Sequence, residues 1–117
     1  MELLTPEQRA QMLANGRANR GREETIDFQP VVRLVCPWND AVWLLTELDP
    51  ENPDIAFGLC DLGMGFPELG TVSMSELASI EGPQGLRIQR DESFTPTRTL
   101  STYSYFARST PPDRKGG

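Results

Sequence analysis

The side chains best suited to chemistry in this sequence are carboxylates. The 117 residues include 17 Asp and Glu but no His. Without His, the chain lacks a Ser-His-Asp or Cys-His nucleophile system, His-ligated zinc and a His general base. Cys36 and Cys60 are too few for an all-cysteine zinc site and do not form a CxxC pair. Catalysis or ligand binding would therefore depend on carboxylates, and no catalytic residue, metal ligand or cofactor is assigned.

These carboxylates are concentrated in the middle of the chain. Residues 23–92 carry a net charge of −11, against +2 for residues 1–22 and +3 for residues 93–117. No Lys or Arg lies between Leu34 and Leu86. We call this interval the acidic segment. Its nine carboxylates are Asp40, Glu47, Asp49, Glu51, Asp54, Asp61, Glu68, Glu76 and Glu81.

Three interpretations of the acidic segment remain open. The simplest is a solvated surface that keeps the protein in solution. The second is recognition of a basic protein surface, which includes the DNA site of a nucleic-acid-binding protein. The third is a divalent cation site, because Asp49, Glu51 and Asp54 supply hard oxygen ligands, although their spacing is not that of an EF-hand loop.

A carboxylate pair could also act as a general acid and base. Asp61 and Glu68 flank a Gly-rich turn and would suit that role if burial separated their pKa values. A simpler interpretation is that Asp61 caps the turn at Gly63-Met64-Gly65 through backbone N–H groups. As a binding face we predict the central acids, with Trp38 as an exposed anchor on a turn. The predicted acids are Glu47, Asp49, Glu51, Asp54, Asp61 and Glu68.

Nucleic-acid binding through the basic ends of the chain is a further alternative. Arg17, Arg20 and Arg22 lie near the N-terminus. Near the C-terminus an aromatic group accompanies Arg98 and Arg108, and it consists of Tyr103, Tyr105 and Phe106. Aromatic and Arg side chains of this kind can stack on single-stranded bases. The net charge of −6 argues against this alternative, because binding to phosphates needs a basic surface.

The elements that must position these residues can be predicted from local signals. Thr5, Pro6 and Gln8 form a capping box, and Gly16 is typical of a helix C′ position, so we expect a helix between them. Residues 17–24 are expected to form a solvated loop. Strands are expected at residues 31–36, 41–49, 55–62, 68–74 and 86–91. Short helices are expected at residues 75–80, capped by Ser73 or Ser75, and at residues 99–107.

Several turns, including the Pro-rich loop at residues 49–54, are too short for helical crossovers. The expected fold class is therefore α+β. A mostly antiparallel sheet of about four to five strands packs in two layers against an N-terminal helix and one or two short later helices.

The length and composition indicate one domain at residues 1–108, followed by a disordered tail at residues 109–117. No apolar run is long enough to cross a membrane, and no basic-then-apolar leader is present, which favours the cytoplasm. Cys36 and Cys60 are accordingly expected to be free, buried thiols. The sequence indicates no oligomeric state.

The central block resembles a known family. Its pattern consists of Leu44–Pro50, Asp54–Gly63, Phe66–Ser73 and Glu76-Leu77, and Leu3–Pro6 with Leu13–Gly16 also matches. Over about residues 2–108 the chain resembles the uncharacterised bacterial domain-of-unknown-function family twenty-nine fifty-eight. The resemblance implies a small protein borne on plasmids, integrative elements or phages, with no catalytic residues to carry over. Together with the acidic segment and the missing catalytic inventory, it favours a non-enzymatic accessory protein of a mobile element that acts on a basic protein surface. A carboxylate-dependent enzyme or a divalent-metal-binding protein that uses the acidic loops stays as an alternative.

Overall fold

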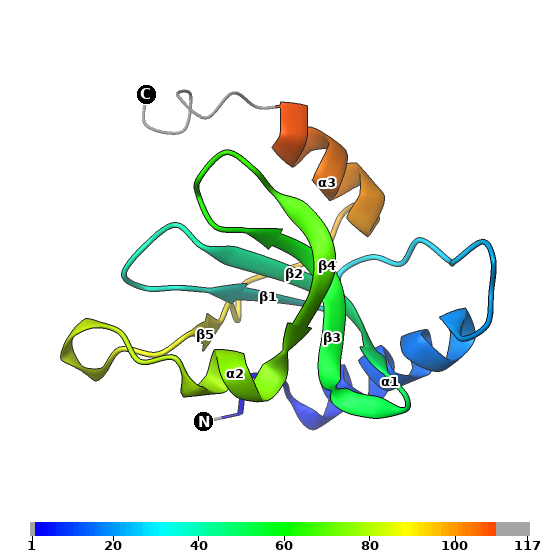
Figure 1. Ribbon diagram of the computed structural model, residues 1–117, viewed down its shortest axis with the longest axis horizontal. Helices are drawn as coiled ribbons and strands as arrows, with labels where there is room; N and C mark the ends of the chain where they lie inside the picture. The colour runs from blue at the N-terminus through cyan, green and yellow to red at the C-terminus, as the bar shows by residue number, and fades with distance from the viewer. Residues whose placement is uncertain (1, 110–117) are drawn as a thin grey trace.

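The computed structural model describes residues 2–109 as an antiparallel sheet with helices on both faces (Figure 1). The strand order is β4-β3-β2-β1-β5, and each neighbouring pair is antiparallel. The expected α+β class is confirmed. In chain order the elements are α1 (Pro6–Asn19), β1 (Val32–Val35), β2 (Val42–Asp49), β3 (Asn52–Asp61), β4 (Glu68–Ser73), α2 (Met74–Ser79), the 3-10 turn η1 (Pro83–Gly85), β5 (Gln89–Arg90) and α3 (Leu100–Ser109).

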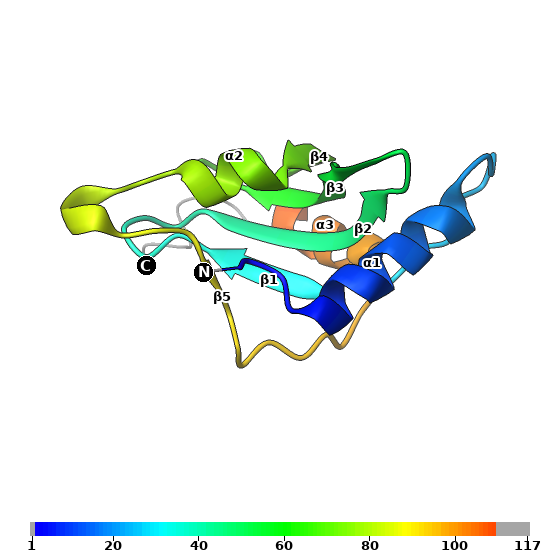
Figure 2. The same ribbon diagram turned by 90° about the horizontal axis from the view of Figure 1, so that it is seen from below.

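The helices form layers on opposite faces of the sheet, as Figure 2 shows. On one face, Met12 of α1 and Leu77 of α2 join the larger apolar cluster with the sheet residue Trp43. On the other face, Leu100 of α3 packs against Leu44 and Leu59. The expectation of two layers is wrong, because neighbouring strands bury apolar side chains on both sides.

Helix α1 begins as expected and ends later than expected. Its capping box is present: Gln8 N donates to Thr5 Oγ1 at 3.0 Å and Thr5 N donates to Gln8 Oε1 at 2.9 Å. Gly16 is not the C′ residue, because α1 continues to Asn19. A Cβ on Gly16 would lie 1.9 Å from the Leu48 carbonyl oxygen. Gly16 therefore allows the helix to approach β2 closely.

Strand β3 begins at Asn52, inside the segment expected to be a Pro-rich loop. The pairing of Asp49 with Asn52 closes a tight turn. Residues 53–55 are not paired with β2, whose register shifts between Leu48 and Asp49. A proline is tolerated at such an irregularity because no ladder hydrogen bond is lost there. Pro53 can thus lie within β3.

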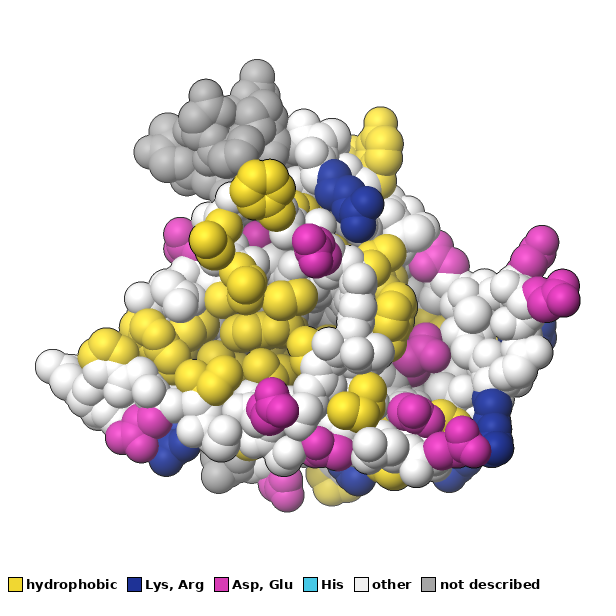
Figure 3. All heavy atoms as spheres, viewed as in Figure 1, with side chains coloured by type: hydrophobic (Ala, Val, Ile, Leu, Met, Phe, Trp, Pro, Cys, Tyr) yellow, Lys and Arg dark blue, Asp and Glu magenta, His cyan; other side chains and the backbone are white. Residues whose placement is uncertain are grey.

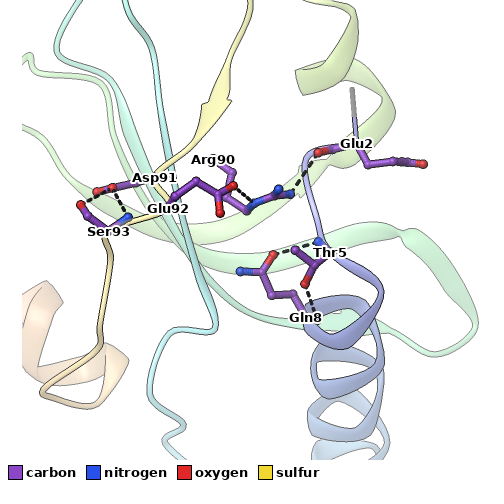
Figure 4. A network of polar contacts seen from close by, with 7 residues as sticks. All are labelled: Glu2, Thr5, Gln8, Arg90, Asp91, Glu92 and Ser93. Atoms are coloured by element: carbon purple, nitrogen blue, oxygen red, sulfur yellow. Dashed lines mark hydrogen bonds and ion pairs between the residues drawn. The ribbon is translucent and has the colours of Figure 1, made fainter.

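Strand β5 consists only of Gln89 and Arg90, whereas residues 86–91 were expected to be extended. Its position is fixed by polar contacts to the start of the chain (Figure 4). Arg90 Nη1 donates to the Glu2 carbonyl at 3.1 Å, and Arg90 Nε pairs with Glu92 at 2.7 Å. The N-terminal segment therefore lies beside β5.

The two later helices are found where they were expected. Ser73 caps α2, accepting from Glu76 N at 3.2 Å. Helix α3 includes Ser109, one residue of the expected tail, and residues 110–117 lie outside the described residues. No helix in the described part is long and apolar enough to cross a membrane.

Candidate functional site

The acids predicted to form one binding face are distributed over three places. Glu47, Asp49 and Glu51 line one cavity near the β2–β3 turn. Asp54 lies beside the start of α2, where Ser75 N donates to it at 2.9 Å. Asp61 and Glu68 lie beyond the other end of this strand pair, opposite Val42 and Cys60 respectively. The ten residues of β3 span about 30 Å, so the first and last groups cannot form one compact site.

Two adjoining cavities form what we call the acidic groove. Their volumes are about 250 Å³ and about 390 Å³, and both are lined by Thr25, Glu47 and Phe57. The groove extends from the end of α1, where Asn19 lies, to the start of α3 at Leu100. It crosses β2, β3 and β4, so three strands and two helices contribute to it.

Glu47 is the carboxylate at the junction of the two cavities. The β2–β3 register shifts between Leu45 and Glu47, which leaves Thr46 as the additional residue of a β-bulge. Asn19 Nδ2 donates to Glu47 Oε1 at 3.1 Å, and Thr46 Oγ1 donates to the same oxygen at 3.4 Å. These two neutral donors orient the carboxylate without cancelling its charge.

The position of Asn19 is fixed by the loop that follows α1. Its Oδ1 accepts from Ile26 N at 2.6 Å, and its Nδ2 also donates to Ile26 O at 3.2 Å. The side chain of Asn19 is 8% exposed, so its amide is satisfied by protein groups rather than by solvent. Asn19 thus connects α1, the 20–28 loop and Glu47.

The outer rim of the groove is charged and solvated. Arg20 Nη2 pairs with Glu51 Oε1 at 2.9 Å, with side chains 61% and 70% exposed. An exposed pair of this kind contributes little to stability. Asp49 Oδ1 accepts from Glu51 N at 2.9 Å and so shapes the turn. Within residues 2–109, the ion pairs do not include Glu47 or Asp49, which leaves the groove negative.

The groove has an apolar floor beside these acids. Ile55 and Phe57 of β3 line it and are half-buried, and Leu69 of β4 lines it with 41% of its surface exposed. A carboxylate beside apolar surface suits an Arg or Lys side chain, whose aliphatic stem is covered while its charged end is paired. The groove thus places the Glu47 carboxylate beside partly exposed apolar surface.

Asp27 lies at the α3 end of the groove. It accepts from Ser101 N at 3.1 Å and from the Ser101 hydroxyl. Partial burial acts to raise the pKa of Asp27, but the hydrogen bonds from Ser101 and Thr99 lower it overall. Asp27 therefore remains ionised and holds the first turn of α3 to the loop.

Asp54 has a structural environment of its own. Its Oδ2 accepts from the Ser73 hydroxyl at 2.6 Å and from the Ser75 hydroxyl at 2.9 Å. These hydrogen bonds, that from Ser73 foremost, lower the pKa of Asp54. Arg9 adds a smaller effect in the same direction. Asp54 thus fastens the start of α2 to β3.

At the far end of the strands, Asp61 has the expected turn contact. Gly63 N donates to Asp61 Oδ1 at 2.9 Å, which confirms that Asp61 caps the Gly-rich turn. The hairpin tip beyond it is apolar and exposed: Leu62 is 52% exposed, Met64 71% and Phe66 79%. This hairpin tip, residues 62–66, lies away from the acidic groove.

Trp38, predicted to be an exposed anchor, is half-buried. A Cβ on Gly82 would lie 2.4 Å from Trp38 Cδ2, so the indole ring packs directly on that glycine. The contact holds the β1–β2 turn against the segment after α2. Part of the ring remains exposed to solvent.

The described structure does not support a metal site at Asp49, Glu51 and Asp54. Within residues 2–109, no group of three or more Asp, Glu, Cys or His side chains is arranged to hold a metal ion. Asp49, Glu51 and Asp54 therefore do not converge. Both cysteines are free, Cys36 is buried, and Cys60 is half-buried rather than buried as expected. Burial raises the pKa of the Cys60 thiol, which makes it a poor nucleophile.

The residues considered for nucleic-acid binding are partly engaged in other contacts. Arg20 pairs with Glu51, and Arg22 Nε donates to the Ala18 carbonyl at 2.9 Å. In the C-terminal aromatic group, the Arg98 guanidinium lies 4.6 Å from the centre of the Phe106 ring. Tyr105 stays 67% exposed. Within the part of the chain that the structure describes, these groups lie on separate parts of the fold and do not form one basic surface, and the basic tail lies outside it.

Sequence reasoning missed the two asparagines that support the groove. Asn15 is 4% exposed, and its Nδ2 donates to the Thr46 carbonyl at 2.9 Å. Asn19 was assigned to a loop. The spacing of Met12, Asn15 and Asn19 is that of one helix face, and this is the signal that would have placed both residues against the sheet.

One comparison with known proteins gives a match. The model of a family described as "Protein of unknown function (DUF2958)" matches residues 3–111. No curated protein and no solved structure matches the chain.

Proposed function

The chain belongs to the DUF2958 family over residues 3–111, and on that premise we propose a non-enzymatic function. The protein is a small accessory protein of a bacterial mobile element that binds a basic protein surface through the acidic groove. The proposed link to a mobile element rests on the family resemblance, because proteins of this family are expected on plasmids, integrative elements and phages. The binding mode follows from the groove itself.

One observation carries the proposal: Glu47 lies over an apolar floor and has no cationic partner among residues 2–109. Its carboxylate is held by Asn19 and Thr46, and Phe57 lies beside it in both cavities. A Lys or Arg side chain entering the groove would pair with Glu47 and cover Phe57 with its methylene groups. This arrangement is prepared before the partner arrives, because Asn19 and Thr46 already fix the carboxylate.

The charge of the surrounding chain supports a basic partner. No Lys or Arg occurs between Leu34 and Leu86, so the charged side chains of β2, β3 and β4 are all carboxylates and create a negative field there. Such a field raises the association rate with basic proteins and repels nucleic acid. The carboxylate-enzyme and metal alternatives have less support, since no described acid cluster converges and Asp61 is used in a turn.

A basic peptide tests the groove directly. The probe is hexa-arginine, titrated into the full chain and followed by calorimetry at low salt. Glu47→Gln with Asp49→Asn removes two charges from the groove. The matched control, Glu7→Gln with Asp40→Asn, removes two charges from exposed positions elsewhere. We expect the groove variant to bind about tenfold more weakly than the control, because one close ion pair is lost.

Two results would contradict this function. If both double variants bind hexa-arginine equally, only net charge matters and the groove is not the site. If affinity does not fall as salt rises from about 50 to about 500 mM, binding is not electrostatic. Circular dichroism of each variant shows whether the fold is retained.

A further inference from the structure

Strand β4 forms one edge of the sheet, and its outer side is open. Within the described residues, β3 is its only strand neighbour. An edge strand turns alternate N–H and C=O groups outward, where they can pair with another chain. The other edge, β5, is only two residues long and thus offers little to pair with. Of these two edges, the six-residue β4 is therefore the one long enough to pair with another chain.

Strand β4 also has few of the features that prevent edge pairing. Its six residues, Glu68–Ser73, contain no Lys or Pro, and Glu68 at the start is the only charged one. They pair with β3 in continuous register, without a bulge to twist the edge away. Lys, Pro and bulges are the devices by which edge strands avoid other chains. Their absence marks β4 as a strand that can accept a partner.

Neither a close contact nor the backbone conformation of the described chain requires a glycine at position 70, in the middle of β4. A Cβ on Gly70 would meet nothing within 4 Å, and Gly70 is not among the residues with positive φ. Its partner Gly58 differs, because a Cβ there would lie 2.0 Å from the Leu44 carbonyl oxygen. Glycine in a strand weakens it, and it often marks close approach by another backbone or a ligand. At Gly70 there is therefore room for the backbone of another chain or for a ligand.

Apolar surface lies on both sides of β4. Leu69 and Thr71 line the acidic groove on one face, while Val72 packs against the larger core on the other. Figure 3 shows apolar side chains on either side of this strand. An added strand would therefore place its alternate side chains against apolar surface on each face.

The charges near β4 indicate which kind of chain could pair with it as an added strand. Glu68 lies at its start, and Asp54 and Glu76 lie near its end. Arg108 lines the hollow beside Glu68, and among residues 2–109 it is the one basic residue in that lining. A second copy of the chain would bring acids against acids. An extended segment with Lys or Arg among apolar residues complements the edge.

We propose that β4 is the docking strand for an extended basic segment of the partner protein, which pairs with it as a sixth strand. This rests on the proposed function, because the same basic partner occupies the acidic groove beside Leu69. Backbone hydrogen bonds to β4 supply affinity, and side chains in the groove supply selectivity.

The test uses a peptide of roughly eight alternating Lys and Val residues. It is added to the full chain labelled with ¹⁵N, and amide shifts and hydrogen exchange are recorded. We expect the largest shifts, and slowed exchange at alternate amides, within Glu68–Ser73. A peptide methylated at alternate backbone nitrogens should bind about tenfold more weakly, because each lost hydrogen bond weakens the pairing. Equal affinity of the two peptides, or no binding at about 1 mM, overturns the proposal.

A matched pair of variants separates this proposal from the groove. Gly70→Lys places a Lys on the edge strand at a position that does not line the groove, and Leu86→Lys adds the same charge at an exposed position outside β4. Only Gly70→Lys should weaken the peptide, by about tenfold. If the peptide shifts only groove residues and Gly70→Lys has no effect, β4 docking fails while the proposed function stands. Dimerisation of the chain through β4 would overturn the choice of partner.

Discussion

Single polar residues determine how α1 meets the sheet. Most of the face that α1 turns to β2 would be expected to be apolar, yet Asn15 is 4% exposed and Asn19 is 8% exposed. The β-bulge explains this choice. Thr46 is left out of the pairing register, and its carbonyl accepts from Asn15 Nδ2 instead. Asn15 thereby satisfies a buried carbonyl that a Leu would leave unpaired.

The Asp54 cluster predicts a pH dependence. Hydrogen bonds from Ser73 and Ser75 lower the pKa of Asp54 in the folded protein. The ionised carboxylate therefore stabilises the fold above the ordinary pKa of Asp, and this contribution is lost as pH falls through the lower folded-state pKa. We expect Asp54→Asn to lower the thermal midpoint at pH 7, with a smaller effect at about pH 2.

Thermal unfolding of Asp54→Asn and of Asp40→Asn, recorded by circular dichroism across that pH range, checks this. Asp40 is exposed and serves as the control. A loss of stability for Asp54→Asn that is the same at both pH values would contradict a role for the ionised carboxylate.

At the scale of the element, strands β3 and β4 carry paired glycines with opposite requirements. Gly58 faces Gly70 across the strands. A Cβ on Gly58 would lie 2.0 Å from the Leu44 carbonyl oxygen, whereas one on Gly70 meets open space. We expect Gly58→Ala to lower the free energy of unfolding by about 2 kcal/mol or more. Gly70→Ala should leave it unchanged or raise it by about 0.5 kcal/mol.

Urea unfolding of both variants measures this difference. Equal destabilisation by the two substitutions would show that Gly70 has a packing role in the monomer. That result would also remove the argument that Gly70 is reserved for a partner.

The starts of α1 and α2 were predicted better than the end of α1 and the start of β3. The capping box at Thr5 and the cap at Ser73 are local signals, and both were found. The end of α1 was missed because a glycine has more than one use: Gly16 permits close approach to Leu48 instead of ending the helix. Pro53 was misassigned for a similar reason, because the irregular register that tolerates it arises between strands.

The candidate site was predicted in part. Glu47, Asp49 and Glu51 are close in sequence around one turn, and the fold keeps them together. Asp61 and Glu68 were grouped with them by charge alone, although the length of β3 separates the two sets. The spacing of Asn19 from Met12 could have placed it against the sheet, whereas the contribution of Thr25 depends on contacts between the loop and the strands, which no local pattern indicates.

The whole molecule combines a high negative charge with an exposed apolar tip. The net charge is −6, and Met64 and Phe66 at the hairpin tip are 71% and 79% exposed. Repulsion between copies opposes contact between such tips at neutral pH. Acidification toward about pH 4 protonates carboxylates and removes that repulsion. We therefore expect self-association to rise steeply there.

Light scattering recorded as a function of pH measures this self-association. The unmodified protein is compared with Phe66→Ser and with Leu86→Lys, a change outside the hairpin tip. Phe66→Ser should reduce association on acidification, because less apolar surface is exposed at the tip. If Phe66→Ser associates as strongly as the unmodified protein, the tip is not the contact surface.

The pairing of β5 with β1 has a consequence for the order of folding. Strands β1 to β4 pair with sequence neighbours through short turns, whereas Leu34 pairs with Arg90, and nearly half of the chain lies between these two residues. Closing that long loop costs more chain entropy than closing any hairpin, and β5 offers only two residues in return. The β1–β4 meander should form first, with β5 docking last. Its amides should exchange through local opening before the rest of the sheet unfolds.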